Sequence, residues 1–158
     1  MTAILLAGRS GAAFAAEIGT MRVNQEVDAI TTMGLDPVRF LVTPRVIAAI
    51  LMTPLLVLFS MLVGLIGGAI TMTSFSIPIV TFMKEVDSAV TFTDFMAGFV
   101  KSFVFAILIA GIGCLRGLQT AAGASAVGES ATRAVVSGII LLVVVDGIFA
   151  VAFYILNV

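Results

Sequence analysis

Long apolar stretches alternate with short polar ones along this chain, a pattern that predicts helices spanning a membrane. No charged residue occurs between Arg45 and Lys84, and a span requires roughly 20 predominantly apolar residues. We therefore expect the clearest transmembrane helix over 46–72. Two further apolar stretches predict full spans over 97–116 and 133–157.

Two details of the longest apolar stretch bear on its shape. Pro54 stands near its start and is expected to kink the helix, which membrane helices tolerate when neighbouring groups satisfy the freed carbonyl. Gly64 and Gly68 form a GxxxG pair, a pattern that permits close helix approach. The pattern is a weak signal, because glycine is common in membrane helices.

The first residues of the chain are also apolar, without a polar lead-in. We expect residues 1–16 to be the end of a spanning helix that begins outside this chain; the alternative is a short N-terminal helix lying in the membrane interface. Residues 117–132 are rich in small residues and predict a loop. Residues 74–96 mix Pro, Ser and Thr with acids and predict an extramembrane connection, with room for a short interfacial helix.

Basic residues predict the orientation, because cytoplasmic segments carry an excess of Lys and Arg. Five lie on one side of the predicted spans and two on the other: Arg22, Arg39, Arg45, Arg116 and Arg133 against Lys84 and Lys101. This distribution places residues 17–45 in the cytoplasm and the connection 74–96 outside, in the periplasm. Lys101 and Arg116 are expected to snorkel to opposite interfaces.

A polar island, "GTMRVNQEVDAITTMGLDPVRF", interrupts the apolar sequence over residues 19–40. Apolar residues near helical spacing form one stripe over 18–34: Ile18, Met21, Val27, Ile30 and Met33. Gly34 suits the position after a helix, and Asp36-Pro37 prevents its continuation. The island therefore predicts one short amphipathic helix, which either lies on the lipid surface or docks into a soluble partner. Its acidic bias favours the partner, since anionic headgroups attract Lys and Arg.

Composition sets the protein class and excludes several functions. Hydrophobic residues make up 61% of the chain and charged residues 11%, and the mean hydropathy is +1.25; a soluble domain carries about a quarter charged residues. The fold class is therefore an all-α, polytopic transmembrane protein. Histidine is absent and Cys114 is the single cysteine, which excludes an intrachain disulfide and a cysteine zinc site. No basic patch suits nucleic acid, and no phosphate-binding GxxxxGK[ST] motif occurs.

A series of short motifs marks residues 7–45: Ala7-Gly8-Arg9, Gly11-Ala12, Ala16-Glu17-Ile18-Gly19, Met21, Gln25, Asp28-Ala29, Met33-Gly34, Asp36-Pro37 and Pro44-Arg45. These motifs make the chain similar to the MlaE family, the permease subunits of lipid-transporting ABC systems that work with MCE-domain proteins. A second segment, "GESATRAVV" over 128–136, resembles the family pattern before the last helix, with Ala131 where Thr is frequent. Family members carry an interfacial helix, a first span and the start of the second upstream of residue 1.

The resemblance implies partners and roles. Residues from about Thr20 to Met33 resemble a coupling helix that sits in a cytoplasmic ABC ATPase, which alone uses ATP; this chain binds no cofactor. It also implies a homodimer in the bacterial inner membrane, a phospholipid or other lipid substrate at the subunit interface, and a periplasmic MCE-domain partner. The residues expected to contact or support the ATPase are Glu17, Met21, Arg22, Gln25, Glu26, Asp28, Met33, Asp36, Pro37 and Arg39.

Ionisable residues at membrane depth are the remaining candidates, because a buried charge there is costly. Asp146 lies in the middle of the last span; it either contacts a lipid headgroup path or a basic partner such as Arg9, or makes a structural hydrogen bond. Arg9 is expected to have a structural pairing role. Glu17 lies two helical turns from it, about 12 Å along the helix. Glu129 and Arg133 mark the cytoplasmic end of the last helix, where snorkelling is the simple explanation for the arginine.

Two other functions stay open at this point. A truncated permease can serve as a non-transporting membrane scaffold or assembly subunit. A membrane enzyme acting on lipids requires clustered nucleophile motifs near one interface, and the sequence contains none.

Overall fold

The computed structural model describes residues 1–156, and every regular element in that range is a helix, which confirms the all-α prediction. In chain order the elements are α1 (Thr2–Leu6), η1 (Ala7–Gly11, a π-helical turn), α2 (Ala12–Val23), α3 (Glu26–Thr32), η2 (Val38–Val42, also π-helical), α4 (Thr43–Ser74), α5 (Ile79–Ala89), α6 (Phe92–Leu118) and α7 (Ala124–Leu156). The first three follow one another without a break, so the opening helix runs past residue 16 to Val23.

Three helices are long and apolar enough to cross a membrane, as the hydropathy pattern predicts: Val38–Ser74, Phe92–Leu118 and Ala124–Ile155. Each is longer than the apolar range that indicated it. The small-residue segment 117–132 is mostly not a loop, because α7 begins at Ala124. Alanine is the best helix former, and Gly123 supplies the turn before it with a φ of +111°.

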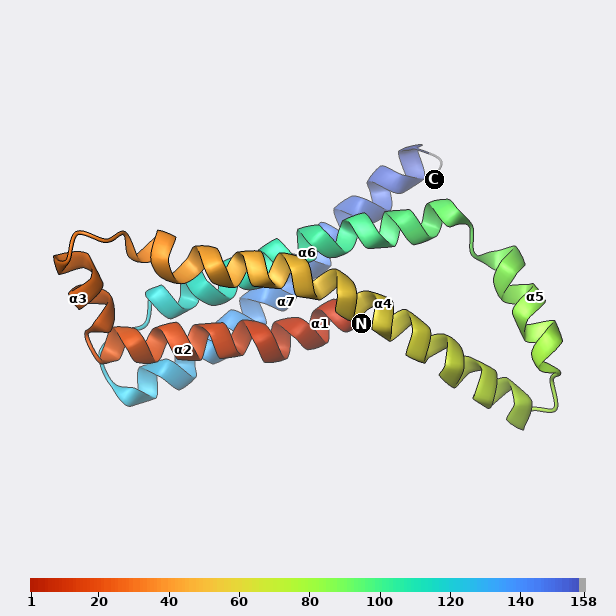
Figure 1. Cartoon of the computed structure of the whole chain (residues 1–158), viewed down its shortest axis with the longest axis horizontal. Helices are drawn as coiled ribbons and strands as arrows, with labels where there is room; N and C mark the ends of the chain where they lie inside the picture. The colour runs from red at the N-terminus through yellow and green to blue at the C-terminus, as the bar shows by residue number, and fades with distance from the viewer. Residues whose placement is uncertain (157–158) are drawn as a thin grey trace.

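The helices α2, α4, α6 and α7 pack together at the α3 end of the molecule, and α4 separates from α6 and α7 toward the other end (Figure 1). α2 packs against α6 and α7, and α6 also packs against α4 and α7. α4 contains Pro54 in its interior and bends along its length (Figure 1), since proline removes a helical hydrogen bond. Its far end diverges from α6, and α5 joins the two there within the expected connection 74–96 (Figure 1).

Glycines bring α2 and α6 into close contact. A Cβ added at Gly113 would lie 2.7 Å from the carbonyl oxygen of Gly11, and one added at Gly117 would lie 2.7 Å from Ile18 Cβ. Ile18 and Cys114 are fully buried beside them. The GxxxG pair that makes a close helix contact is therefore Gly113 and Gly117 in α6, since a Cβ at Gly64 would meet nothing within 4 Å.

A capping box starts α6 on the α5 side. Thr91 is the N-cap, and the Asp94 carboxylate accepts a hydrogen bond from the Thr91 backbone N–H at 3.1 Å. The arrangement satisfies amide donors that the first turn of a helix leaves free.

Candidate functional site

The polar island folds as two helices, so the prediction of one helix over 18–34 is wrong. α2 ends at Val23, and Gln25 adopts a left-handed φ of +62° before α3 begins at Glu26. The break falls where the apolar stripe skips from Met21 to Val27, so each helix keeps its own apolar side. Hydrophobic spacing over so short a range did not reveal this turn.

The end of α3 follows the sequence prediction. Gly34 has a φ of +79°, its N–H bonds the carbonyl of Thr31, and the N–H of Leu35 bonds the carbonyl of Ile30. This pair of bonds is the Schellman arrangement that favours glycine after a helix. Asp36 then accepts a hydrogen bond from the N–H of Val38 at 3.0 Å, so its carboxylate supports the turn into η2.

One side of α3 is packed and the other is open. Val27 and Ile30 are buried with Leu41, against Met21 and Leu118. Met33, predicted to belong to this stripe, is 67% exposed, because α3 ends before its position. The other exposed candidates at this end are Arg22, Gln25, Glu26, Asp28, Asp36 and Arg39, while Met21 and Pro37 are half-buried.

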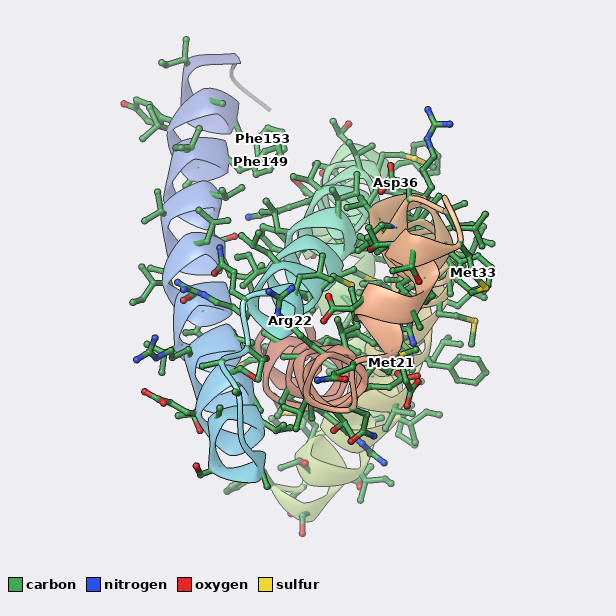
Figure 2. The ribbon with its side chains drawn as sticks, turned by 90° about the vertical axis from the view of Figure 1, so that its left-hand side faces the viewer. Met21, Arg22, Met33, Asp36, Phe149 and Phe153 are labelled. Atoms are coloured by element: carbon green, nitrogen blue, oxygen red, sulfur yellow. The ribbon has the colours of Figure 1, made fainter. Side chains whose placement is uncertain are left out.

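Figure 2 looks onto this end of the molecule, with Met21 and Arg22 near the end of α2 and Met33 and Asp36 beyond them on the α3 side. Apolar residues that the sequence did not single out are also exposed here. Leu35 is 46% exposed and Phe40 is 59% exposed. The open surface around α3 therefore combines carboxylates with large apolar side chains.

Glu17 pairs within the molecule. Arg45 Nη2 lies 2.6 Å from Glu17 Oε1, and its Nη1 donates to the carbonyl oxygen of Leu41 at 2.7 Å. The pair ties α2 to α4 just behind the α3 turn. Arg9, which was expected to pair structurally, makes no ion pair within residues 1–156. The Pro44-Arg45 motif drew attention to Arg45 in the sequence, but its partner Glu17 became evident only from the structure.

Asp146 pairs with Lys101, so its basic partner is not Arg9, whereas the snorkelling of Lys101 stays a prediction. The Lys101 ammonium lies 5.6 Å from the ring centre of Phe105 and 5.7 Å from that of Phe149. Aromatic faces attract cations at such distances. Phe149 extends from α7 beside Phe153 (Figure 2), and its ring centre is 6.4 Å from that of Phe105. Alternative partners for Asp146 stayed open in the sequence because pairing across helices is not local.

The start of α7 carries a surface ion pair. Arg133 Nη2 lies 2.6 Å from Glu129 Oε1, one helical turn away, and both side chains are more than 60% exposed. Arg116 of α6 donates to Ser137 Oγ at 2.9 Å. A shallow hollow of about 80 Å³ lies at this point. Its lining includes the charged residues Arg116, Glu129 and Arg133 and the hydroxyl residues Thr120 and Ser130.

A much larger apolar groove lies between α4, α5 and α6, where the helices diverge. Its volume is about 840 Å³, and its lining includes Leu62, Leu65, Phe82 and Phe95. Asp94 is the one charged side chain among the described residues that line it. The apolar lining of the groove is compatible with a bound hydrocarbon chain. Among the described residues no group of His, Cys, Asp and Glu is placed to hold a metal.

Comparison with known proteins connects these features. The chain is 46% identical over 143 residues to a probable ABC transporter permease protein of Synechocystis, covering 90% of this chain and 54% of the relative. It is 38% identical over 155 residues to the chloroplastic protein trigalactosyldiacylglycerol 1 of Arabidopsis thaliana, and the match covers 98% of this chain and 44% of that protein. A probable ABC transporter permease protein of Rickettsia typhi is 37% identical over 145 residues, covering 91% and 56%.

The chain thus spans about half the length of the curated relatives it matches. The sequence model of one family, described as Permease MlaE, matches residues 1–152. That match includes the α3 turn, the α2–α6 glycine contact and the Lys101–Asp146 pair. The chain therefore belongs to the MlaE permease family.

Proposed function

We propose that this chain is the membrane permease part of an ABC transporter that moves phospholipid or another lipid between the bacterial inner membrane and a periplasmic MCE-domain carrier. The observation that carries the proposal is the α2–α3–η2 turn, a short terminated helix held at one end of a bundle of spanning helices. Such a turn gives a soluble ATPase a rigid contact through which its movement is transmitted to the membrane helices. Family membership and two relatives described as probable ABC transporter permeases support it.

The open surface around α3 is the proposed contact with a cytoplasmic ATPase. Glu26 and Asp28 are exposed in the first turn of α3, and acidic side chains there are repelled by anionic headgroups. Exposed Leu35 and Phe40 add apolar area of the kind that marks protein interfaces. The ATPase hydrolyses ATP, and this chain contributes no catalytic residue and binds no cofactor.

The lipid cargo is proposed from two independent features. One relative bears the name of a galactolipid, trigalactosyldiacylglycerol. The apolar groove between α4, α5 and α6 accommodates hydrocarbon. A second copy of the permease completes the transport path in this proposal, and the α5 connection faces the MCE-domain partner.

Co-purification of the full-length protein tests the ATPase contact. We expect Glu26→Lys with Asp28→Lys to reduce the recovered ATPase about tenfold or more, because two attractive or neutral contacts become repulsive. Membrane insertion is expected to stay intact. A matched control is the reversal Glu85→Lys with Asp87→Lys in α5, at the other end of the molecule. Equal recovery with the α3 reversal would refute the docking role.

The alternative function, a membrane scaffold without transport, is separated by a second measurement. Proteoliposomes containing the full-length permease and its ATPase are expected to transfer labelled phospholipid to an MCE-domain acceptor only with ATP. A complex that binds the ATPase but transfers no lipid would favour the scaffold.

A further inference from the structure

The Lys101–Asp146 ion pair is asymmetric. The Lys101 side chain is 22% exposed and the Asp146 side chain is 56% exposed. Two aromatic rings hold the ammonium from the protein side, whereas Lys101 is the one described residue that pairs with the Asp146 carboxylate. The cation is therefore fixed in place, and its anion is the more replaceable partner.

The position of this ion pair along α6 makes it costly, because ionised side chains within the hydrocarbon of a membrane are unfavourable. Lys101 lies about 14 Å from the first residue of α6 and about 26 Å from the last, at 1.5 Å per residue. α6 is about 40 Å long, so a hydrocarbon layer of about 30 Å centred on it includes Lys101, toward the α5 side. Ionisable residues at such depth commonly line substrate paths.

Space for a ligand group adjoins both charges. Lys101 lines a cavity of about 160 Å³ together with Thr53 and Ser102, and Asp146 lines one of about 130 Å³ together with Leu142. Phe105 lines both. Each volume far exceeds the ~10–15 Å³ needed for one water, and hydroxyl residues accompany the ammonium in the first cavity.

We propose that Lys101 binds the phosphate of a lipid headgroup, and that Asp146 takes the place of this phosphate when no lipid is bound. Lysine acts as a point charge toward phosphate oxygens, so exchange of one oxyanion for another keeps the ammonium paired. The rings of Phe105 and Phe149 keep the ammonium at the site during the exchange. The inference rests on the proposed lipid transport and names a residue that recognises the substrate.

The two halves of the pair should then have opposite effects on lipid binding. Native mass spectrometry of the full-length protein would measure retained dioleoylphosphatidylglycerol against dioleoylglycerol, which lacks phosphate. We expect Lys101→Met to lower phosphatidylglycerol retention about tenfold, and Lys101→Arg to preserve it. Asp146→Asn should raise that retention several-fold, because it removes the competing anion.

A purely structural ion pair gives a different pattern. Both Lys101→Met and Asp146→Asn would then lower thermal stability together, and neither would change the preference for phosphatidylglycerol. That result would overturn the proposal. If Lys101→Met does not fold, Asp146→Asn decides alone, since unchanged or reduced retention contradicts it. Lys84→Met, in α5, is the control lysine and should leave retention unchanged.

Inorganic phosphate separates the two sources of the same chemistry. Retention that millimolar phosphate leaves unchanged supports a lipid headgroup, and full displacement by phosphate would overturn the lipid as ligand. Retention is measured without ATP or the ATPase. If the predicted retention pattern is observed but ATP-driven lipid transfer is not, the proposed function is rejected and the lipid site at Lys101 stands. If transfer is observed without the predicted retention pattern, only the lipid site is rejected.

Discussion

The two ends of this molecule are packed in opposite ways. At the α3 end, glycine brings α2 within contact of the α6 backbone, and Glu17–Arg45 ties α2 to α4. At the α5 end, α4 and α6 separate around a groove of about 840 Å³. Close packing without voids resists deformation. The contrast fits the proposed function, in which the first end transmits force from the ATPase and the second accommodates lipid.

The largest expected effect is a single methyl group in the packed end. Gly113→Ala places a Cβ 2.7 Å from the carbonyl oxygen of Gly11, a backbone atom that cannot swing away. We expect the variant to lose about 1–3 kcal/mol of unfolding free energy. Gly111→Ala in the same helix is the control, since its Cβ meets nothing within 4 Å and alanine favours helix. Thermal unfolding in detergent measures both, and equal midpoints would contradict the close contact.

The Glu17–Arg45 pair should have the next largest effect. Removing one partner with Glu17→Gln is expected to cost about 1 kcal/mol, since Glu17 is 58% exposed and solvent weakens the pair. The reciprocal variant, Glu17→Arg with Arg45→Glu, should recover part of that loss. A double-mutant cycle on the unfolding free energy measures the coupling, and a coupling of zero would show that the pair does not hold the turn.

The open end should tolerate a larger change than the packed end. Gly64 lines the groove, and a Cβ added there would meet nothing within 4 Å, so Gly64→Leu is expected to change stability by less than about 0.5 kcal/mol. The leucine fills part of the groove, and lipid transfer in proteoliposomes should fall. Unchanged transfer with normal stability would separate the groove from the transport path.

The smallest effect is expected at the start of α7. Glu129 and Arg133 form an exposed pair one turn apart, and such pairs contribute about 0.3–0.5 kcal/mol. Arg133→Gln should therefore shift the unfolding midpoint only slightly, and added salt should erase the difference. A large shift would mean that Arg133 takes part in the packed end.

Hydropathy and helix-stop signals were sufficient for the long helices and for the end of α3 at Gly34, because both depend on local sequence. They were insufficient for the turn at Gln25, where a left-handed residue divides one apolar stripe into two. The partners of Glu17 and Asp146 also escaped, since Arg45 and Lys101 reach them only after the helices pack. Gly113 and Gly117 show the same limit, because the sequence contains two GxxxG pairs and only packing distinguishes them.

The capping box at the start of α6 has a consequence for the neighbouring groove. Its one charged lining residue, Asp94, has a carboxylate oxygen bound to the Thr91 amide, near the positive end of the helix dipole. The groove wall therefore interacts with an acyl chain almost entirely through apolar contacts. Lipid tails are as apolar as the side chains around them, so moving a chain from bilayer to groove releases almost no solvation free energy. In the proposed transporter, such a groove would bind and release an acyl chain with nearly equal ease, so another part of the assembly must set the direction of transport.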